Sequence, residues 1–160
     1  MVTDRTTPTR ATSTRATPTR GVAPGANAPT PRAARELLAR ADLLLSESIG
    51  AHSPQDQFLG AYLAALRGAG AVLAAVEGPG GMRGSRTRNA WLRLAGAAPE
   101  FTAWADHFAG YSATRSAVEA GGARSLSGEE ADRFFVDVGR FLHEVESFLV
   151  GSAQPDLRAS

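Results

Sequence analysis

The 160-residue chain contains no cysteine, which excludes disulfide bonds and metal sites built from thiolates. Lysine is absent as well, so all 17 basic residues are arginine. Alanine, glycine and proline are abundant beside arginine. We interpret this set as a high-GC coding bias and not as selection for bidentate arginine chemistry. A phosphate-binding loop of the Walker type needs a lysine, so the glycine-rich stretch GPGGMRGSRTR (78–88) does not qualify as one.

Histidine is scarce and scattered. The three histidines, His52, His107 and His143, have no spacing of the H-x-x-x-H kind that brings two metal ligands together. His52 falls in an expected turn, whereas the other two flank apolar residues at the rims of expected helices. We therefore expect exposed or rim positions for all three, no metal site and no cofactor.

Long hydrophobic runs are also missing. No apolar run approaches the roughly 18 residues that span a bilayer, and the first thirty residues lack the apolar core of a secretory signal. These absences predict a cytoplasmic protein with no membrane partner.

The first 31 residues contain few large apolar side chains but five of the nine prolines. Such a segment buries too little surface to offset about 1–2 kcal/mol of backbone entropy per ordered residue. We expect a disordered tail at 1–31, a folded domain at 32–151 and a frayed end at 152–160. The tail repeats arginine every fifth residue in RTTPTRATSTRATPTR, which permits salt-sensitive contact with nucleic acid. Alternatively, the repeat reflects the DNA alone and translation starts downstream at Val22.

Charge is divided unevenly between these parts. Residues 1–31 hold four arginines and Asp4, a net charge of +3, whereas residues 32–160 hold 13 arginines and 15 acids, a net charge of −2. By charge alone, the folded domain is not a basic nucleic-acid binder.

The domain sequence predicts helices only, because apolar residues recur every three or four positions and nowhere alternate with a sustained period of two. Thr30 is the expected N-cap of a first helix with Pro31 at its first position. Ser53, followed by Pro54, begins a second helix that runs to Glu77.

Three further helices are expected in the second half of the chain. A short one lies in AWLRLAGAAP (90–99), and a longer one begins at Pro99 and ends at Gly121. Ser127 and Glu130 form a capping box that begins a last helix, which ends at Gly151. The predicted fold is all-α, an up-and-down bundle of four main helices plus one short helix.

Arginines cluster in and after the expected loop between the second and third helices. Arg83, Arg86, Arg88 and Arg93 follow one another with no acid between Gly78 and Glu100. This is the densest positive patch of the domain and a candidate binding site for a phosphate or an acidic surface. The alternative is a solvated loop without a ligand.

The last helix carries many acids, which we expect on its solvated face in weak ion pairs with arginine and not in acid–base chemistry. Arg133 is expected to pair with Asp137, and Arg140 with Glu144, because each pair is spaced i, i+4.

The order and spacing of several short motifs resemble a small high-GC bacterial branch of the HEPN (higher eukaryotes and prokaryotes nucleotide-binding) superfamily over about residues 33–150. The residues that carry the resemblance are Tyr62-x-x-Ala65-Leu66-Arg67, Asn89-x-Trp91, Pro99-x-x-x-x-Trp104, Glu119-Ala120-Gly121 and Ala131-Asp132. The resemblance implies a four- to five-helix bundle, often dimeric. Its members include metal-independent RNases and non-catalytic RNA- or nucleotide-interacting modules, among them toxin and host-defence components.

In the RNases of that superfamily, four to six residues separate an arginine from a following histidine, and no histidine of this chain has that spacing. We therefore expect a non-enzymatic module that binds RNA, a nucleotide or a protein partner. Two alternatives stay open. One is a divergent RNase that uses Arg140 and His143 across a homodimer, and the other is a purely structural dimerisation module.

Overall fold

The computed structural model describes residues 30–78, 90–121 and 126–153 of the chain. Within these ranges there are helices and no strands, so the all-α prediction is confirmed. The elements are α1 (Arg32–Ser48), α2 (Pro54–Glu77), α3 (Ala90–Ala97), the short 3-10 helix η2 (Pro99–Phe101), α4 (Thr102–Ala109), α5 (Ser112–Glu119) and α6 (Gly128–Ala153). The predicted candidate arginines Arg83, Arg86 and Arg88 lie outside the described residues.

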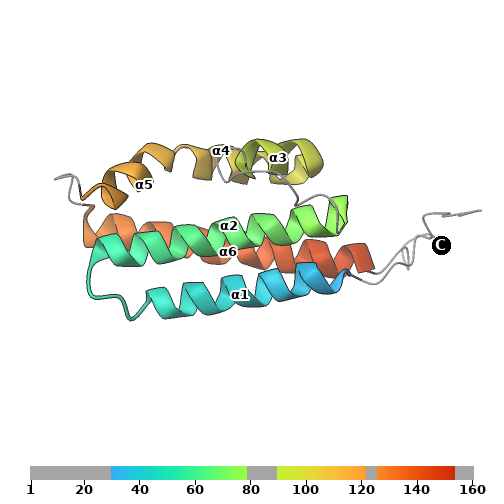
Figure 1. Ribbon diagram of the computed structural model, residues 1–160, viewed down its shortest axis with the longest axis horizontal. Coiled ribbons are helices and arrows are strands. Elements are labelled where there is room, and N and C mark those ends of the chain that lie inside the picture. Colours follow the sequence, from blue (N-terminus) through green and yellow to red (C-terminus); the bar gives the residue numbers. More distant parts are fainter. Residues whose placement is uncertain (1–29, 79–89, 122–125, 154–160) are drawn as a thin grey trace, which may run out of the picture.

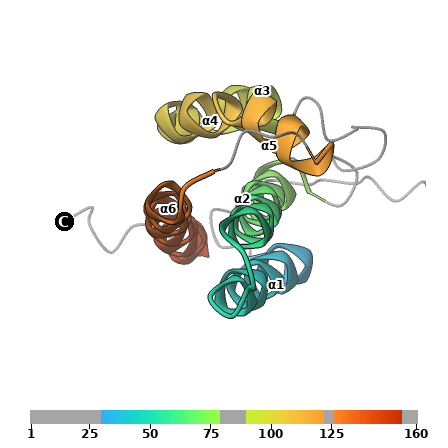
Figure 2. The ribbon, with the colours of Figure 1, turned by 90° about the vertical axis from the view of Figure 1, so that its left-hand side faces the viewer.

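The three long helices α1, α2 and α6 lie side by side, and α3, α4 and α5 follow one another across the far side of α2 and α6 (Figure 1). In the end-on view α2 lies in the middle, with α1 on one side and α3 to α5 on the other (Figure 2). The start of α1, the end of α2 and the end of α6 are at one end of the bundle. The start of α6 lies at the opposite end, and so does α5.

Helix α2 is long and apolar enough to cross a membrane by length and composition, although no such run was expected from the sequence. Its eleven buried residues are spread along the whole helix, from Phe58 to Ala74. Because its neighbours α1, α6 and α3 cover it, we interpret α2 as the core helix of the bundle.

Two of the three predicted N-caps are confirmed. The Ser53 side chain accepts a hydrogen bond from the Asp56 backbone N–H at 3.1 Å. In the predicted capping box, the Ser127 hydroxyl accepts from the Glu130 N–H at 3.1 Å, and the Glu130 carboxylate accepts from the Ser127 N–H at 2.9 Å. These contacts satisfy N–H groups that the first helical turn leaves without a partner.

The predicted N-cap at Thr30 is wrong. Pro31 precedes α1, and no side chain caps it. The Thr30 hydroxyl donates instead to the Leu149 carbonyl at 2.9 Å, which ties the beginning of α1 to the end of α6. The predicted end of the last helix at Gly151 is also wrong, since α6 continues to Ala153.

The long helix predicted from Pro99 to Gly121 is interrupted at Gly110 and Tyr111, so that η2, α4 and α5 take its place. Glycine has low helix propensity, and the Tyr111 ring turns inward, with its centroid 4.7 Å from that of Phe134. Gly121, which has a φ of 69°, follows α5 as predicted.

The core is dominated by aromatic rings that join α2, α3 and α4 to α6. Phe108 of α4 is fully buried, and its ring centroid lies 5.1 Å from both Trp91 and Phe141. The predicted apolar stripe of α6 is confirmed, because it is buried at Ala131, Phe134, Val138, Phe141, Leu142, Val145 and Leu149. Leu92 is 75% exposed, although the sequence places it among the apolar residues of its short helix.

The glycine and alanine content of α2 indicates close packing, and Gly68 is where α2 approaches α6. A Cβ atom at Gly68 would lie 2.5 Å from Leu142 Cδ2 and 3.0 Å from Phe141 Cε1, whereas a Cβ at Gly70 would meet only Leu37 Cδ1, at 3.7 Å. The two glycines therefore allow a comparison on one helix between a crowded position, Gly68, and an uncrowded one, Gly70.

We expect Gly68→Ala to lower the free energy of unfolding by up to about 2 kcal/mol. Crowding in the core costs about 1–3 kcal/mol, and alanine's better helix propensity returns about 1 kcal/mol of that. Gly70→Ala has the propensity gain without the clash and should stabilise the protein by about 0.5–1 kcal/mol. Urea denaturation measures both. Equal effects of the two substitutions would contradict the close approach at Gly68.

Two acids face each other between α1 and α6. Partial burial, together with the neighbouring carboxylate of Glu146, raises the pKa of Asp42. A raised carboxyl pKa in the folded state means that ionised Asp42 opposes folding, and this penalty is absent once pH falls below the ordinary value of about 3.9.

Asp42→Asn is therefore expected to raise the free energy of unfolding at pH 7, by a few tenths of a kcal/mol because solvent screens the pair. The same substitution should have no effect near pH 3, where the Asp42 carboxyl is neutral in the folded and the unfolded chain. Urea denaturation at the two pH values tests this, with the exposed Asp106→Asn as control. A stabilisation that is as large at pH 3 as at pH 7 would exclude the charge as its cause.

Candidate functional site

Arg93 is the one predicted binding arginine that the structure describes. It links the start of α3 to the end of α2. Its guanidinium pairs with the Glu77 carboxylate at 2.6 Å, with about a quarter of each side chain exposed. The contact joins the last residue of α2 to the first turn of α3. Arg93 therefore fixes the start of α3 against the end of α2.

Arg140 and His143 are both exposed on α6, one turn apart on the same face. The ion pair predicted between Arg140 and Glu144 is wrong. In the described ranges no ion pair joins Arg140 to Glu144, because the Glu144 carboxylate accepts a hydrogen bond from Trp104 Nε1 at 2.8 Å. Within one copy of the chain, nothing in the described ranges positions Arg140 and His143 for a shared reaction.

The predicted pair between Arg133 and Asp137 is also wrong. Arg133 pairs one turn earlier, with Glu129 at 2.9 Å. Asp137 lies 3.1 Å from Nε2 of His107. This contact places His107 at the rim of α4 with its ring against Trp104, Phe108 and Tyr111, which agrees with the rim position expected from the sequence. His52 is exposed between α1 and α2, as expected.

Several motif residues of the sequence meet in a polar contact inside the bundle. Trp91 Nε1 donates to the Tyr62 hydroxyl at 3.0 Å, and the Ser112 hydroxyl lies 3.5 Å from the same oxygen. The Arg115 guanidinium lies over the Tyr62 ring, 4.9 Å from its centroid. Because Tyr62 and Trp91 are buried, this cluster holds α2, α3 and α5 together and offers no open site.

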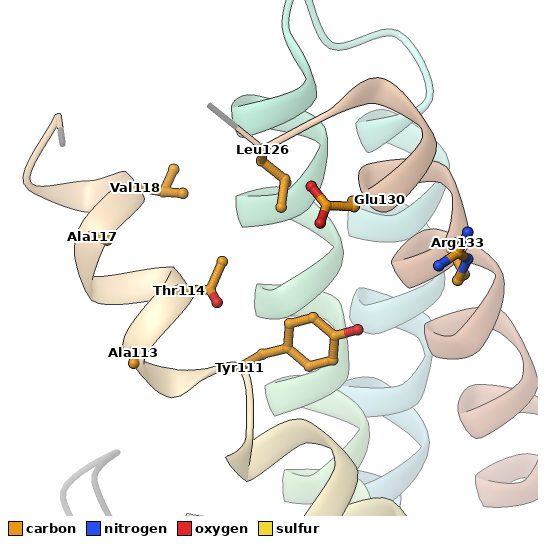
Figure 3. Close-up of a pocket in the computed structure, with 8 residues that line it drawn as sticks. All are labelled: Tyr111, Ala113, Thr114, Ala117, Val118, Leu126, Glu130 and Arg133. Carbon is orange, nitrogen blue, oxygen red and sulfur yellow. The ribbon is translucent and has the colours of Figure 1, made fainter. Parts of the chain in front are cut away.

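A pocket lies between α5 and the beginning of α6, where the sequence gives no motif (Figure 3). Its volume is about 290 Å³. One wall comes from α5 and the other from the start of α6, with the Tyr111 ring reaching across between them. Its lining residues are Tyr111, Ala113, Thr114, Ala117, Val118, Leu126, Glu130 and Arg133.

The charged groups of the pocket, Glu130 and Arg133, come from α6. Glu130 is held by its capping contact with the Ser127 backbone. Arg133 is bound more weakly, because 67% of its side chain is exposed and its partner Glu129 is 83% exposed. Exposed pairs of this kind contribute about 0–1 kcal/mol, so the guanidinium can turn to another anion at small cost.

Among the described residues, no group of three or more histidines and acids is placed to hold a metal ion. The same part of the chain leaves no buried side-chain nitrogen or oxygen without a hydrogen-bond partner. Among the described residues, the geometry offers a concave site between α5 and α6.

Fold and motifs together define a helical bundle of the HEPN superfamily. A family model described as SAV_6107-like HEPN matches residues 48–146, well over half of the chain, and the chain belongs to this family. The match runs from the last residue of α1 into α6 and includes the pocket. No curated protein and no solved structure matches the chain.

Proposed function

We propose that this HEPN chain is a non-catalytic, cytoplasmic module that binds RNA through its arginine-bearing segments. One observation carries the proposal. The start of α1 and the end of α2 lie at the same end of the bundle (Figure 1). The tail with Arg5, Arg10, Arg15 and Arg20 and the segment with Arg83, Arg86 and Arg88 are therefore both joined to that end.

Charge supports a polyanionic partner for these segments. Residues 79–89 contain three arginines and no acid, while the domain from residue 32 onward has a net charge of −2. Arginine binds phosphate through paired hydrogen bonds, and releasing counterions from a nucleic acid adds affinity that falls with salt. The ion pair between Arg93 and Glu77 fixes where the second segment leaves the bundle.

Fluorescence anisotropy with a short labelled single-stranded RNA tests the proposal. Replacing Arg83, Arg86 and Arg88 together with alanine should weaken binding about tenfold at low salt. Each lost phosphate contact should also reduce the slope of log K against log salt by about 0.7. The single variant Arg88→Ala is compared with Arg40→Ala, which removes one exposed arginine from α1 and should leave binding nearly unchanged. Unchanged binding by the triple variant would show that the 79–89 segment does not contribute to RNA binding.

Divergent RNase activity is the second candidate, because Arg140 and His143 are both exposed on one face of α6. Two such faces from two copies would have to meet for the four side chains to act on one RNA. Light scattering that finds only monomers at working concentration would exclude this candidate, and the proposed binding function does not require a dimer.

A further inference from the structure

We propose that the pocket between α5 and α6 binds a small aromatic anion, one ring carrying a phosphate or carboxylate group. This inference does not rest on the RNA-binding proposal, because none of the arginines used there lines the pocket. Its volume of about 290 Å³ is at the lower limit of known ligand pockets, which suits a single ring with one charged group.

The pocket exists because α5 is incompletely covered. No residue of α5 is fully buried, although Ala117 and Val118 turn partly toward the bundle. The interruption at Gly110 and Tyr111 directs α5 toward α2, and Val118 of α5 is only partly buried where it packs against the core. Apolar surface in this state gains about 25 cal/mol per Å² when a ligand covers it.

The apolar and polar parts of the pocket are separated in a way that orients a ligand. Ala113, Ala117 and Val118 supply small apolar contacts from α5, and Leu126, just before α6, adds a fourth (Figure 3). The Tyr111 ring offers an edge-to-face or stacked contact to an aromatic ring, and its hydroxyl points toward α6. The ring of the ligand is therefore expected against α5.

The charged group of the ligand is expected beside Arg133. The guanidinium has five donors and pairs with phosphate or carboxylate in a planar geometry. Its only ion pair within the described ranges is the exposed one with Glu129. The Glu130 carboxylate, held in the capping box, lies on the same wall and repels an anion placed close to it.

Phenyl phosphate is the probe, and the backbone amide resonances of the full chain are the readout. We expect saturable shifts confined to residues 111–118 and 126–133, with a dissociation constant at or below about 1 mM. Inorganic phosphate alone should bind more weakly, because it lacks the ring. Absence of saturation up to about 10 mM phenyl phosphate would overturn the proposal. Equal affinity for inorganic phosphate would mean an adventitious ion only.

Three variants locate the site. Ala117→Leu should fill the apolar part and abolish binding, and Arg133→Gln should weaken it about five- to tenfold. Glu129→Gln removes the competing carboxylate and should strengthen binding about twofold. The controls Ala103→Leu on α4 and Arg140→Gln on α6 change the same residue types at exposed positions outside the pocket, and they should bind like the wild type. Wild-type affinity in Ala117→Leu would overturn the proposal, provided that its amide spectrum shows a folded chain.

Two further probes separate the sources of such a ligand. Nucleoside monophosphates that displace phenyl phosphate would make the pocket a site for one base and its phosphate, whereas displacement by benzoate alone would indicate a free aromatic acid. Either result supports the pocket as a site. The triple variant of Arg83, Arg86 and Arg88 is expected to lose RNA binding. If it still binds phenyl phosphate in the pocket, ligand binding in the pocket does not depend on RNA binding.

Discussion

Phe108→Ala is expected to lower the free energy of unfolding by about 3–5 kcal/mol, because it empties the centre of the aromatic core. The Phe108 side chain is fully buried, and its ring contacts rings from two other helices: Trp91 of α3 and, on α6, Phe134 and Phe141. Alanine would leave a cavity that surrounding rings cannot fill without changing rotamers. Since a small domain has about 5–15 kcal/mol of total stability, the variant should be only marginally folded.

Urea denaturation followed by tryptophan fluorescence measures this effect, because Trp91 and Trp104 both lie close to the Phe108 ring, with centroid distances of 5.1 and 5.6 Å. The control is Leu92→Ala on α3, where 75% of the side chain is exposed and the change should stay within about 0.5 kcal/mol. A loss below about 1 kcal/mol in Phe108→Ala would contradict this packing of the rings.

Tyr62→Phe should cost about 1–3 kcal/mol, because it removes only an oxygen but leaves Trp91 Nε1–H buried without its acceptor. Trp91 is 6% exposed and Tyr62 3%, so water has little access to replace the lost contact. The phenylalanine ring keeps the stacking on Phe134 and the contact with the Arg115 guanidinium.

Tyr111→Phe is the matched control, since its hydroxyl lines the open pocket and its loss should change stability by less than about 0.5 kcal/mol. A double-mutant cycle with Trp91→Phe isolates the hydrogen bond. The loss in the double variant should be smaller than the sum of the single losses, because neither polar group is then left unpaired. Strict additivity would mean that the Trp91–Tyr62 contact contributes nothing.

The helical fold is readable from the sequence because its signals are local. Ser53 with Pro54, and Ser127 with Glu130, mark helix starts through contacts within one turn. The apolar stripe of α6 follows the helical period over seven buried positions. Such patterns need no knowledge of the neighbouring helices.

Features that depend on the placement of other helices were not predictable. Arg133 has acids one turn away on both sides, and Asp137 is taken by His107 from α4, so the pair forms with Glu129. The hydroxyl of Thr30 finds the Leu149 carbonyl, 119 residues along the chain, in place of the expected cap. In both cases, contacts with other helices decide which of the possible partners the side chain takes.

The pocket was missed for the same reason. None of its eight lining residues belongs to a recognisable binding motif, and Ala113, Thr114 and Ala117 read as an ordinary helix surface. The site depends on the interruption at Gly110 and Tyr111, and this in turn depends on the inward Tyr111 ring. A glycine within the predicted long helix was the one signal of a break.

The central claim is that this HEPN chain binds RNA without cleaving it, and one incubation tests the claim most directly. A fluorescently labelled structured RNA is mixed with the purified full chain in EDTA, and the sample is divided between a native gel and a denaturing gel. The account predicts a shifted complex on the first and intact RNA on the second. Cleavage that His143→Ala or Arg140→Ala abolishes would contradict it and would establish α6 as a catalytic face.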